Sequence, residues 1–369
     1  MPKISVIVPC YNVAGFLPKC LDSLINQTLH DIEIICIDDK STDTTLNILQ
    51  KYKQTDPRIK VIASENNTGV ATTRNKGIDF ATGEYIGFVD PDDYVDLDFY
   101  EKLYNHATMF NTIVTKASVM VTDMITGETG VHYGEKQVKK HIAYFSSAFW
   151  SAIYSHDFLQ QHQIKFPDNM VYAEDAAFLA HVCTKTNNIG FVDNTAYHYF
   201  HKRPDSLDSD FFSHKKAQSA LTAIKLNLTR IEVANIPPND LVRYLDSHVL
   251  GHLQHGINKK FENNNDRYEM FTLLHHVYRT FPELRNLIKN RFTRRTAHYI
   301  AKNNYGMYTN FVCYRRKRFY LLGLIPIVKH IKYTNSTYWL LLDYIPLLKV
   351  KDGRKFFLFN FILILKARG

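Results

Sequence analysis

The sequence predicts an α/β domain with a mostly parallel sheet, followed by a helical region and a basic tail with an apolar repeat. Two observations predict the domain. Apolar runs of strand length alternate with stretches of helical periodicity through the first hundred residues. The apolar runs show little polar alternation, which is typical of parallel strands covered on both faces. With 369 residues, 45% of them hydrophobic, the chain can bury a large core.

The strands and helices of this domain are expected in regular alternation. The expected strands are ISVIVPC (4–10), IEIICIDD (32–39), IKVIAS (59–64) and YIGFVD (85–90). The expected helices, each long enough to cross between parallel strands, are 16–29, 42–54 and 69–81. We expect Ser41 or Thr42 to cap the second helix, because both are good N-cap residues and Asp43 suits the first turn.

The rest of the chain divides into two further regions. We expect the α/β domain to cover residues 1–210, because the composition changes near LDSDFFSHKK. Residues 211–310 show helical periodicity. The tail, 311–369, repeats a short apolar unit. Its three copies are LGLIPIVK (322–329), LDYIPLLK (342–349) and FNFILILK (359–366).

Charge separates the two halves of the chain. Residues 1–200 carry a net charge of −8 and residues 201–369 a net charge of +17, which together give the total of +9. A basic half suits nucleic acid, an anionic membrane surface or an acidic partner. Because no nucleic-acid reader motif is recognisable, we expect no nucleic-acid partner.

Cysteine usage and the N-terminus indicate a cytoplasmic protein. The five cysteines are widely spaced, mostly in apolar runs, and include no CxxC pair, which favours reduced core thiols. The apolar run before Cys10 is short and leads into an ordinary strand pattern, so we expect no signal peptide. No apolar run reaches the length of about 18 residues that a membrane-spanning helix needs.

Polar residues follow the expected strands, at the edge where such sheets bind ligands. The strand 85–90 runs into a turn that holds Asp90, Asp92 and Asp93. Clustered carboxylates repel one another unless a cation lies among them, and Mg²⁺ or Mn²⁺ takes one or two carboxylates together with water and substrate phosphates. Asp90 and Asp92 are therefore candidate metal ligands. The alternative is a solvated turn that caps a helix, and we expect Asp96 to cap the helix that follows.

Four blocks of this region resemble family 2 glycosyltransferases, which have the GT-A fold. The blocks are VIVPCYN (6–12), IDDKSTD (37–43), NNTGVATTRNKG (66–77) and YIGFVDPDD (85–93). The resemblance implies that Asp90 and Asp92 form the family's DxD motif, which holds Mn²⁺ or Mg²⁺ against the donor diphosphate. It also implies that Asp39 binds the base, usually uracil. Pro9, Tyr11 and Asn12 would line the nucleotide pocket.

The resemblance also places Arg74 near the nucleotide. The residues themselves favour a simpler interpretation, in which Arg74 lies on the exposed surface of the helix 69–81. Asp38 is interpreted as structural support, because its neighbour Asp39 matches the family motif better.

An acidic pair opens a later apolar helical pattern. Glu174 and Asp175 begin the run EDAAFLAHV, and acids at a helix N-terminus need no further explanation than the macrodipole. The run resembles the family's ED-x-x-F motif, which implies that Asp175 is the catalytic base. Inverting glycosyl transfer needs one carboxylate to take the proton of the acceptor hydroxyl while a metal stabilises the departing diphosphate.

The segment HKRPDS (201–206) resembles the family's Arg-x-Arg-x-x-Ser pattern only in part. Arg203 and Ser206 match this pattern, which can contact the donor diphosphate, but His201 replaces the first arginine. A basic loop that closes the domain is the alternative.

The expected function is metal-dependent, inverting transfer of a hexosyl or N-acetylhexosaminyl group. The donor is a nucleotide-sugar, usually a UDP-sugar in this family, and the acceptor a glycan or lipid-linked glycan of lipopolysaccharide or capsule. Short apolar units flanked by Lys and Arg suit an anionic bilayer, so we expect a peripheral protein at the inner face of the cell membrane. A basic, β-rich cap on the helices is the alternative for the tail. The alternatives for the whole protein are a non-catalytic binding protein with a decayed site and a nucleotidyltransferase.

Overall fold

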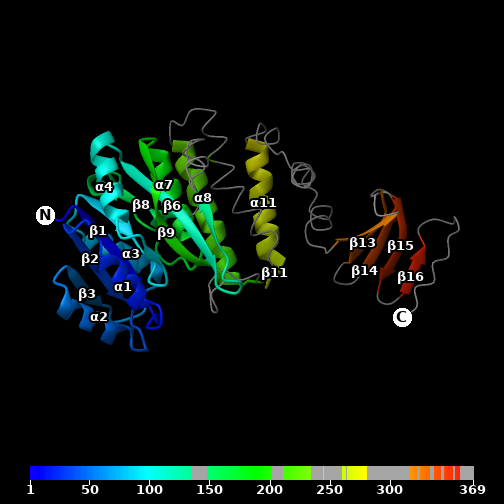
Figure 1. The fold of residues 1–369 in the computed structure, drawn as a ribbon. Helices are drawn as coiled ribbons and strands as arrows, with labels where there is room; N and C mark the ends of the chain where they lie inside the picture. Colours follow the sequence, from blue (N-terminus) through cyan, green and yellow to red (C-terminus); the bar gives the residue numbers. More distant parts are fainter. Residues whose placement is uncertain are drawn as a thin grey trace. The chain divides into compact units, whose positions relative to one another are not determined.

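A computed structural model describes two compact units, Met1–Asp266 and Arg267–Gly369. The described residues are 1–133, 148–201, 211–233, 244, 260–262 and 264–280, together with the backbone of 316–321, 325–332, 336–341, 345–351 and 354–357. Figure 1 shows the fold with its elements labelled.

One large sheet organises the first unit (Figure 1). Its strands are β1 (Ile4–Cys10), β2 (Ile32–Asp38), β3 (Ile59–Ala63), β4 (Tyr85–Phe88), β5 (Tyr94–Val95), β6 (Val114–Asp123), β7 (Thr129–Tyr133), β8 (Ala152–Ser155) and β9 (Ile189–His201). Their order is β3-β2-β1-β4-β8-β6-β9-β5, with β7 paired to β6. The four strands expected from sequence are confirmed, and all of them pair in parallel.

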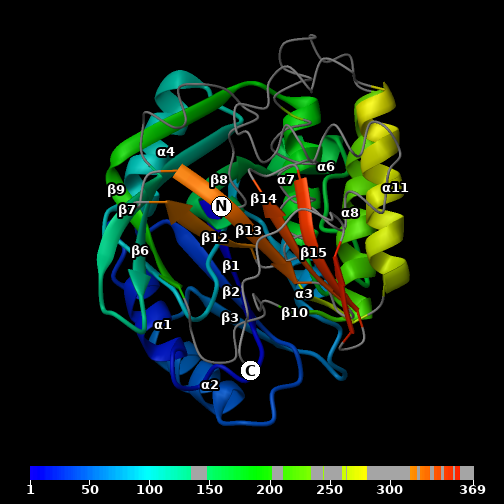
Figure 2. The same cartoon turned by 90° about the vertical axis from the view of Figure 1, so that its right-hand side faces the viewer.

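The sheet continues beyond β4 with strands of mixed direction. Strand β8 pairs antiparallel to β4 and to β6, whereas β9 pairs parallel to β6. The long strands β6 and β9 run side by side in Figure 2. Strand β9 also pairs antiparallel to β5, the two-residue strand that follows the Asp-rich turn. This pairing brings β9 next to that turn.

Helices cover both faces of the parallel strands. The first four are α1 (Leu17–Ile25), α2 (Thr45–Thr55), α3 (Val70–Phe80) and α4 (Phe99–Phe110). Side chains of α1, α2 and α4 share one apolar core with Val6 and Val8 of β1. Side chains of α3 share another core with Ile7 of the same strand. Since successive strand residues face opposite sides, both faces of the sheet are buried, as the continuous apolar runs predicted.

Gly77 allows α3 to approach β1 closely. A Cβ atom at this position would lie 2.3 Å from a methyl carbon of Ile7, well inside any normal contact. The glycine at the end of the RNKG block therefore serves the packing of α3 against β1.

The capping prediction for α2 is wrong. The helix begins at Thr45, and neither Ser41 nor Thr42 caps it. Both residues instead bind Asn12 at the end of β1: the Ser41 hydroxyl accepts from the Asn12 amide at 3.0 Å, and the Thr42 amide donates to the Asn12 side chain at 2.8 Å. Asp43 lies before the helix, where one carboxylate oxygen accepts from the Thr45 amide at 2.9 Å.

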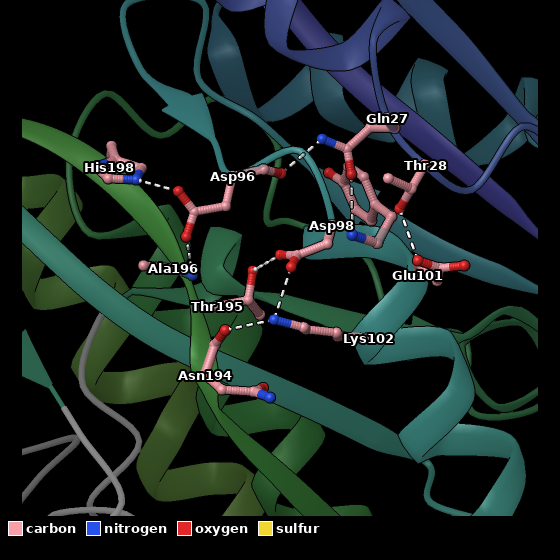
Figure 3. Close-up of polar contacts among 11 residues, drawn as sticks. Gln27, Thr28, Asp96, Asp98, Glu101, Lys102, Asn194, Thr195, Ala196 and His198 are labelled. Atoms are coloured by element: carbon pink, nitrogen blue, oxygen red, sulfur yellow. Dashed lines mark hydrogen bonds and ion pairs between the residues drawn. The ribbon is translucent and has the colours of Figure 1, made fainter.

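The capping prediction for Asp96 is also wrong (Figure 3). Its carboxylate accepts from the Ala196 amide at 2.8 Å and contacts the His198 ring at 2.7 Å, so it fastens β5 to β9. At the first turn of α4, the Gln27 side chain accepts from the Tyr100 amide at 3.1 Å. A side chain just beyond the end of α1 therefore satisfies a donor in the first turn of α4.

Further helices complete the first unit. Short α6 (His156–Gln161) follows β8, α7 (Glu174–Lys185) precedes β9, and α8 (His214–Val233) packs against α7. The Arg230 guanidinium of α8 donates to the Ala177 carbonyl at 2.6 Å. Helix α11 (Asn264–Thr280) begins in the first unit and continues past its last residue, Asp266, whereas most of residues 234–259 lie outside the described part.

The tail of the second unit forms an antiparallel sheet. Its strands are β12 (Arg316–Leu321), β13 (Ile325–Lys332), β14 (Ser336–Leu341), β15 (Ile345–Lys351) and β16 (Arg354–Phe357). In the hairpin β12–β13 the pairing register shifts just before Tyr320, which pairs with Pro326. In the hairpin β14–β15 it shifts just before Leu340, which pairs with Pro346. The repeat seen in the sequence is therefore a repeated hairpin. Its third copy, 359–366, lies outside the described residues.

In the described part of the chain, no helix combines the length and apolar character that crossing a bilayer requires.

Candidate active site

The carboxyl ends of β1, β2 and β4 meet at one edge of the sheet, because the three strands are parallel neighbours. Two residues at this edge, Asn12 and Lys40, have left-handed backbone conformations with φ of 51° and 65°. Ala173, before the acidic pair of α7, has φ of 64°. Such conformations are uncommon outside glycine and concentrate at functional sites.

The end of β1 carries Pro9, Tyr11 and Asn12. The Ile7 carbonyl accepts from the Val89 amide, which shows that the backbone groups of odd-numbered β1 residues point toward β4. Pairing with β4 ends at Ile7. Pro9 has no amide hydrogen, and none is needed there because no ladder bond to β4 is made. The Tyr11 side chain is 47% exposed at the same edge.

Asp39 organises the loop that enters α3. Its carboxylate accepts from the Thr68 amide at 2.8 Å, the Thr68 hydroxyl at 2.9 Å and the Gly69 amide at 2.8 Å. Gly69 has φ of 84°, a conformation that favours glycine. Asp39 is thus a buried loop anchor, and its expected contact with the base stays a prediction.

The turn 90–93 concentrates negative charge. Asp90 and Asp92 are half-buried, and Asp93 is buried. Burial raises the pKa of Asp93 well above its ordinary value, and the neighbouring Asp92 and Asp90 carboxylates add to the rise. A bound cation would relieve this repulsion.

Arg74 lies at the centre of the site instead of on the helix surface. Its side chain is 6% exposed and donates to Asp90 at 2.8 Å and to Glu174 at 2.9 Å. Its guanidinium also lies over the Phe149 ring, 4.6 Å from the centroid. Burial alone would lower the pKa of Arg74, but the Asp90 and Glu174 carboxylates outweigh it and raise the pKa. The surface interpretation of Arg74 is therefore wrong.

Arg74 brings together two acidic motifs that are far apart in the sequence. Glu174 and Asp175 form the first turn of α7, where the Asp175 carboxylate accepts from the Ala176 amide at 2.7 Å. Burial raises the pKa of both carboxyl groups, and Asp175 adds to the rise at Glu174. The electrostatic influence of Asp90 on Asp175 also raises the pKa of Asp175. The candidate base therefore lies close enough to Asp90 of the candidate metal turn to interact with it electrostatically.

The donor set of the turn suits a hard divalent cation. In the described residues, no three His, Cys, Asp or Glu side chains form a complete metal cage. Two carboxylates, Asp90 and Asp92, are the number that Mg²⁺ or Mn²⁺ commonly takes when water and phosphate complete its shell. The expected diphosphate contacts, Arg203 and Ser206, lie outside the described residues.

Comparison with known proteins agrees with this geometry. The sequence matches the description "Glycosyl transferase family 2" over residues 5–177. Residues 5–177 belong to glycosyl transferase family 2. This family 2 region contains β1 to β8 and the first residues of α7, and so includes both acidic motifs.

Relatives of the family 2 region come from several bacteria. The chain is 30% identical to "Putative glycosyltransferase EpsH" of Bacillus subtilis over 212 residues, which is 54% of this chain and 60% of that protein. It is 33% identical to "Poly(ribitol-phosphate) beta-glucosyltransferase" of Bacillus spizizenii over 209 residues, which is 54% of this chain and 32% of that protein. The chain thus spans less than two thirds of the length of these relatives.

The fold resembles a solved structure, S. aureus TarS 1-349 in complex with UDP-GlcNAc. The TM-score is 0.68 at 22% identity, with coverage of 90% of this chain and 97% of that one. The GT-A fold expected for the family 2 region is confirmed.

The sequence did not reveal one residue of the site. Tyr197 of β9 places its hydroxyl 3.0 Å from the Asp90 amide and 2.9 Å from the Asp93 carboxylate. The aromatic run AYHYFH (196–201) gave a weak signal, because strand alternation puts Tyr197 and Tyr199 on one face. Nothing in the sequence indicated which residue of that face reaches the turn.

Proposed function

We propose that the protein transfers a sugar, with inversion, from a UDP-sugar to a hydroxyl group of a glycan or lipid-linked acceptor in cell-surface polysaccharide biosynthesis. One observation carries the proposal: Arg74 joins Asp90 of the metal turn to Glu174, next to the candidate base Asp175. Family 2 membership of residues 5–177 supports the reaction class. TarS in complex with UDP-GlcNAc and the poly(ribitol-phosphate) beta-glucosyltransferase support the donor and the acceptor class.

The proposed reaction exchanges one bond at the anomeric carbon. Asp175 takes the proton of the acceptor hydroxyl, whose oxygen forms a bond to this carbon from the face opposite the diphosphate. The bond to the diphosphate oxygen breaks, and the diphosphate leaves with the electron pair. The transition state resembles an oxocarbenium ion. Asp90 and Asp92 would hold a Mn²⁺ or Mg²⁺ ion, which would neutralise charge on the departing diphosphate.

Donor binding is assigned to the edge formed by β1 and β2. Tyr11 is exposed there. It lies between Pro9, which is in β1, and Asn12, which follows the strand. The family resemblance assigns the base to Asp39, whose buried carboxylate also accepts from Thr68 and Gly69. From the family resemblance we assign the diphosphate to Arg203 and Ser206. We also assign to Arg74 the role of holding Asp90, and its expected place near the nucleotide stays a prediction.

Replacing Asp92 by Ala tests the metal requirement. We expect nucleotide release in the presence of Mn²⁺ and acceptor to fall about 100- to 1000-fold, because the loss of several kcal/mol of charge stabilisation corresponds to this factor. The measurement is steady-state release of UDP, with and without added Mn²⁺. Asp157→Ala, at an exposed acid in α6, is the control and should keep full activity. Full activity of Asp92→Ala, or of wild type in chelator, contradicts metal dependence.

The same assay separates the proposed enzyme from two other classes. A non-catalytic binding protein would bind UDP-sugar without releasing UDP, whatever the acceptor. A nucleotidyltransferase would instead form the nucleotide sugar from a sugar phosphate. A screen of nucleotide sugars with membrane glycolipid as acceptor therefore identifies the class and the donor together.

We also propose that the basic tail holds the protein at the cytoplasmic face of the membrane. Residues 301–369 contain 13 basic and 2 acidic side chains. Each basic residue near an anionic surface contributes about 1 kcal/mol, so Lys317→Gln/Arg318→Gln should weaken binding to phosphatidylglycerol vesicles about 30-fold in a flotation assay. The control, Lys51→Gln/Lys53→Gln, removes equal charge from α2 and should bind normally. Equal binding by both variants contradicts the proposal.

A further inference from the structure

The hydroxyl of Tyr197 lies against the backbone of the turn that carries Asp90 and Asp92. It accepts from the Asp90 amide at 3.0 Å and donates to the Asp93 carboxylate at 2.9 Å. A single hydroxyl therefore joins the first and last residues of the turn. The Asp93 amide also donates to the Asp90 carbonyl at 2.9 Å, which closes the turn on itself.

Strand β9 makes a second bond to the same turn. The Phe200 amide donates to the other carboxylate oxygen of Asp93 at 3.0 Å. Asp93 is 2% exposed, and each of its carboxylate oxygens accepts a hydrogen bond from β9, one from Tyr197 and one from Phe200. On the other side, Arg74 holds the Asp90 carboxylate. The turn is thus fastened at both of its ends.

The Tyr197 ring cannot shift to follow the turn. It is fully buried and stacks on Trp150, with centroids 4.1 Å apart and planes inclined by 29°. It also meets the Phe99 ring edge to face, with centroids 6.4 Å apart. Close packing of the ring restrains the position of its hydroxyl, and the hydroxyl in turn restrains Asp90 and Asp93 through its two hydrogen bonds.

We propose that Tyr197 and Asp93 are positioning residues that set the affinity of the Asp90–Asp92 turn for a divalent cation bound together with a nucleoside diphosphate. The inference rests on the proposed function. A phenyl ring would be enough to fill the buried position of Tyr197. The hydroxyl is the group that contacts the turn, and both of its described hydrogen bonds go to Asp90 and Asp93. Residues that orient metal ligands from the outer shell typically change metal affinity 10- to 100-fold.

The test compares Tyr197→Phe with Tyr154→Phe in the full chain. Both tyrosines are fully buried, and each hydroxyl donates to one protein acceptor, which for Tyr154 is the Phe149 carbonyl at 2.7 Å. Mn²⁺ binding in the presence of excess UDP is measured by electron paramagnetic resonance of the free ion. We expect Tyr197→Phe to bind Mn²⁺ 10- to 100-fold more weakly than wild type, and Tyr154→Phe to bind it normally. Both variants should melt a few degrees lower.

Three outcomes would overturn the inference. Wild-type Mn²⁺ affinity in Tyr197→Phe leaves only a packing role for the hydroxyl. Equal loss of Mn²⁺ affinity in Tyr197→Phe and Tyr154→Phe indicates general destabilisation. A wild-type protein that binds no Mn²⁺ with UDP overturns the proposed metal dependence as well, so the two failures are distinguishable. If Tyr197→Phe does not fold, Asp93→Asn tests the same contact and should show the same loss of affinity.

Discussion

Replacing Asp175 by Asn is expected to lower kcat for sugar transfer by about 100- to 10,000-fold, the range that general-base catalysis contributes. Asparagine has the same shape and keeps an oxygen to accept from the Ala176 amide. It cannot take a proton from the acceptor hydroxyl. The expected change is therefore in the chemical step, with the affinity for UDP and Mn²⁺ unchanged.

The measurement combines kcat for transfer with the Kd of UDP from calorimetry. Asp157→Asn is the matched control, because Asp157 is also an acid in the first turn of a helix but is exposed. It should stay within about twofold of wild type, since surface substitutions have small effects. If Asp175→Asn retains more than a tenth of the wild-type kcat, Asp175 is not the base.

Replacing Arg74 by Met is expected to lower the free energy of unfolding by about 3–5 kcal/mol, the usual cost of leaving buried charges without their partner. The change leaves Asp90 and Glu174 without the cation that they share. Methionine retains apolar contact with the Phe149 and Phe166 rings, so lost packing contributes little. Urea unfolding followed by circular dichroism measures the change.

Two further variants give the Arg74 prediction its controls. Lys165→Met breaks an exposed pair with Asp79, whose side chains are 48% and 56% exposed, and should cost no more than about 1 kcal/mol. Arg74→Met/Glu174→Met removes one buried charge on each side and should recover part of the loss. A loss below 1 kcal/mol in Arg74→Met means that the network does not stabilise the fold.

The network around Arg74 also explains why each acidic motif could be predicted from the sequence, whereas the contact between the two motifs could not. Asp90 and Asp92 follow a buried strand, and Asp175 opens a helix, so each motif is readable from a few neighbouring residues. The contact between Arg74 and Glu174 spans 100 positions in the chain, and the contact between Tyr197 and Asp90 spans 107. No local pattern encodes which side chains such distant segments bring together.

The wrong predictions have the same cause. Ser41 and Thr42 have the chemistry of helix caps, and so does Asp96. In the folded chain their partners are Asn12, just beyond β1, and Ala196 and His198 on β9. Arg74 has the spacing of an exposed helical residue, yet its guanidinium is enclosed by Asp90, Glu174 and the Phe149 ring. Tertiary partners overrode the local preference in every case.

The sequence by itself determined the parallel strands, their crossover helices and the edge at which the acids gather, because these depend on apolar periodicity and on the direction of parallel strands. Only the folded chain shows which charges are paired and which groups hold the acidic turn 90–93. The reason is that a buried carboxylate or guanidinium must find its partner wherever packing supplies one. Arg74 meets Asp90 and Glu174, and Tyr197 meets the turn 90–93, only after the sheet has formed.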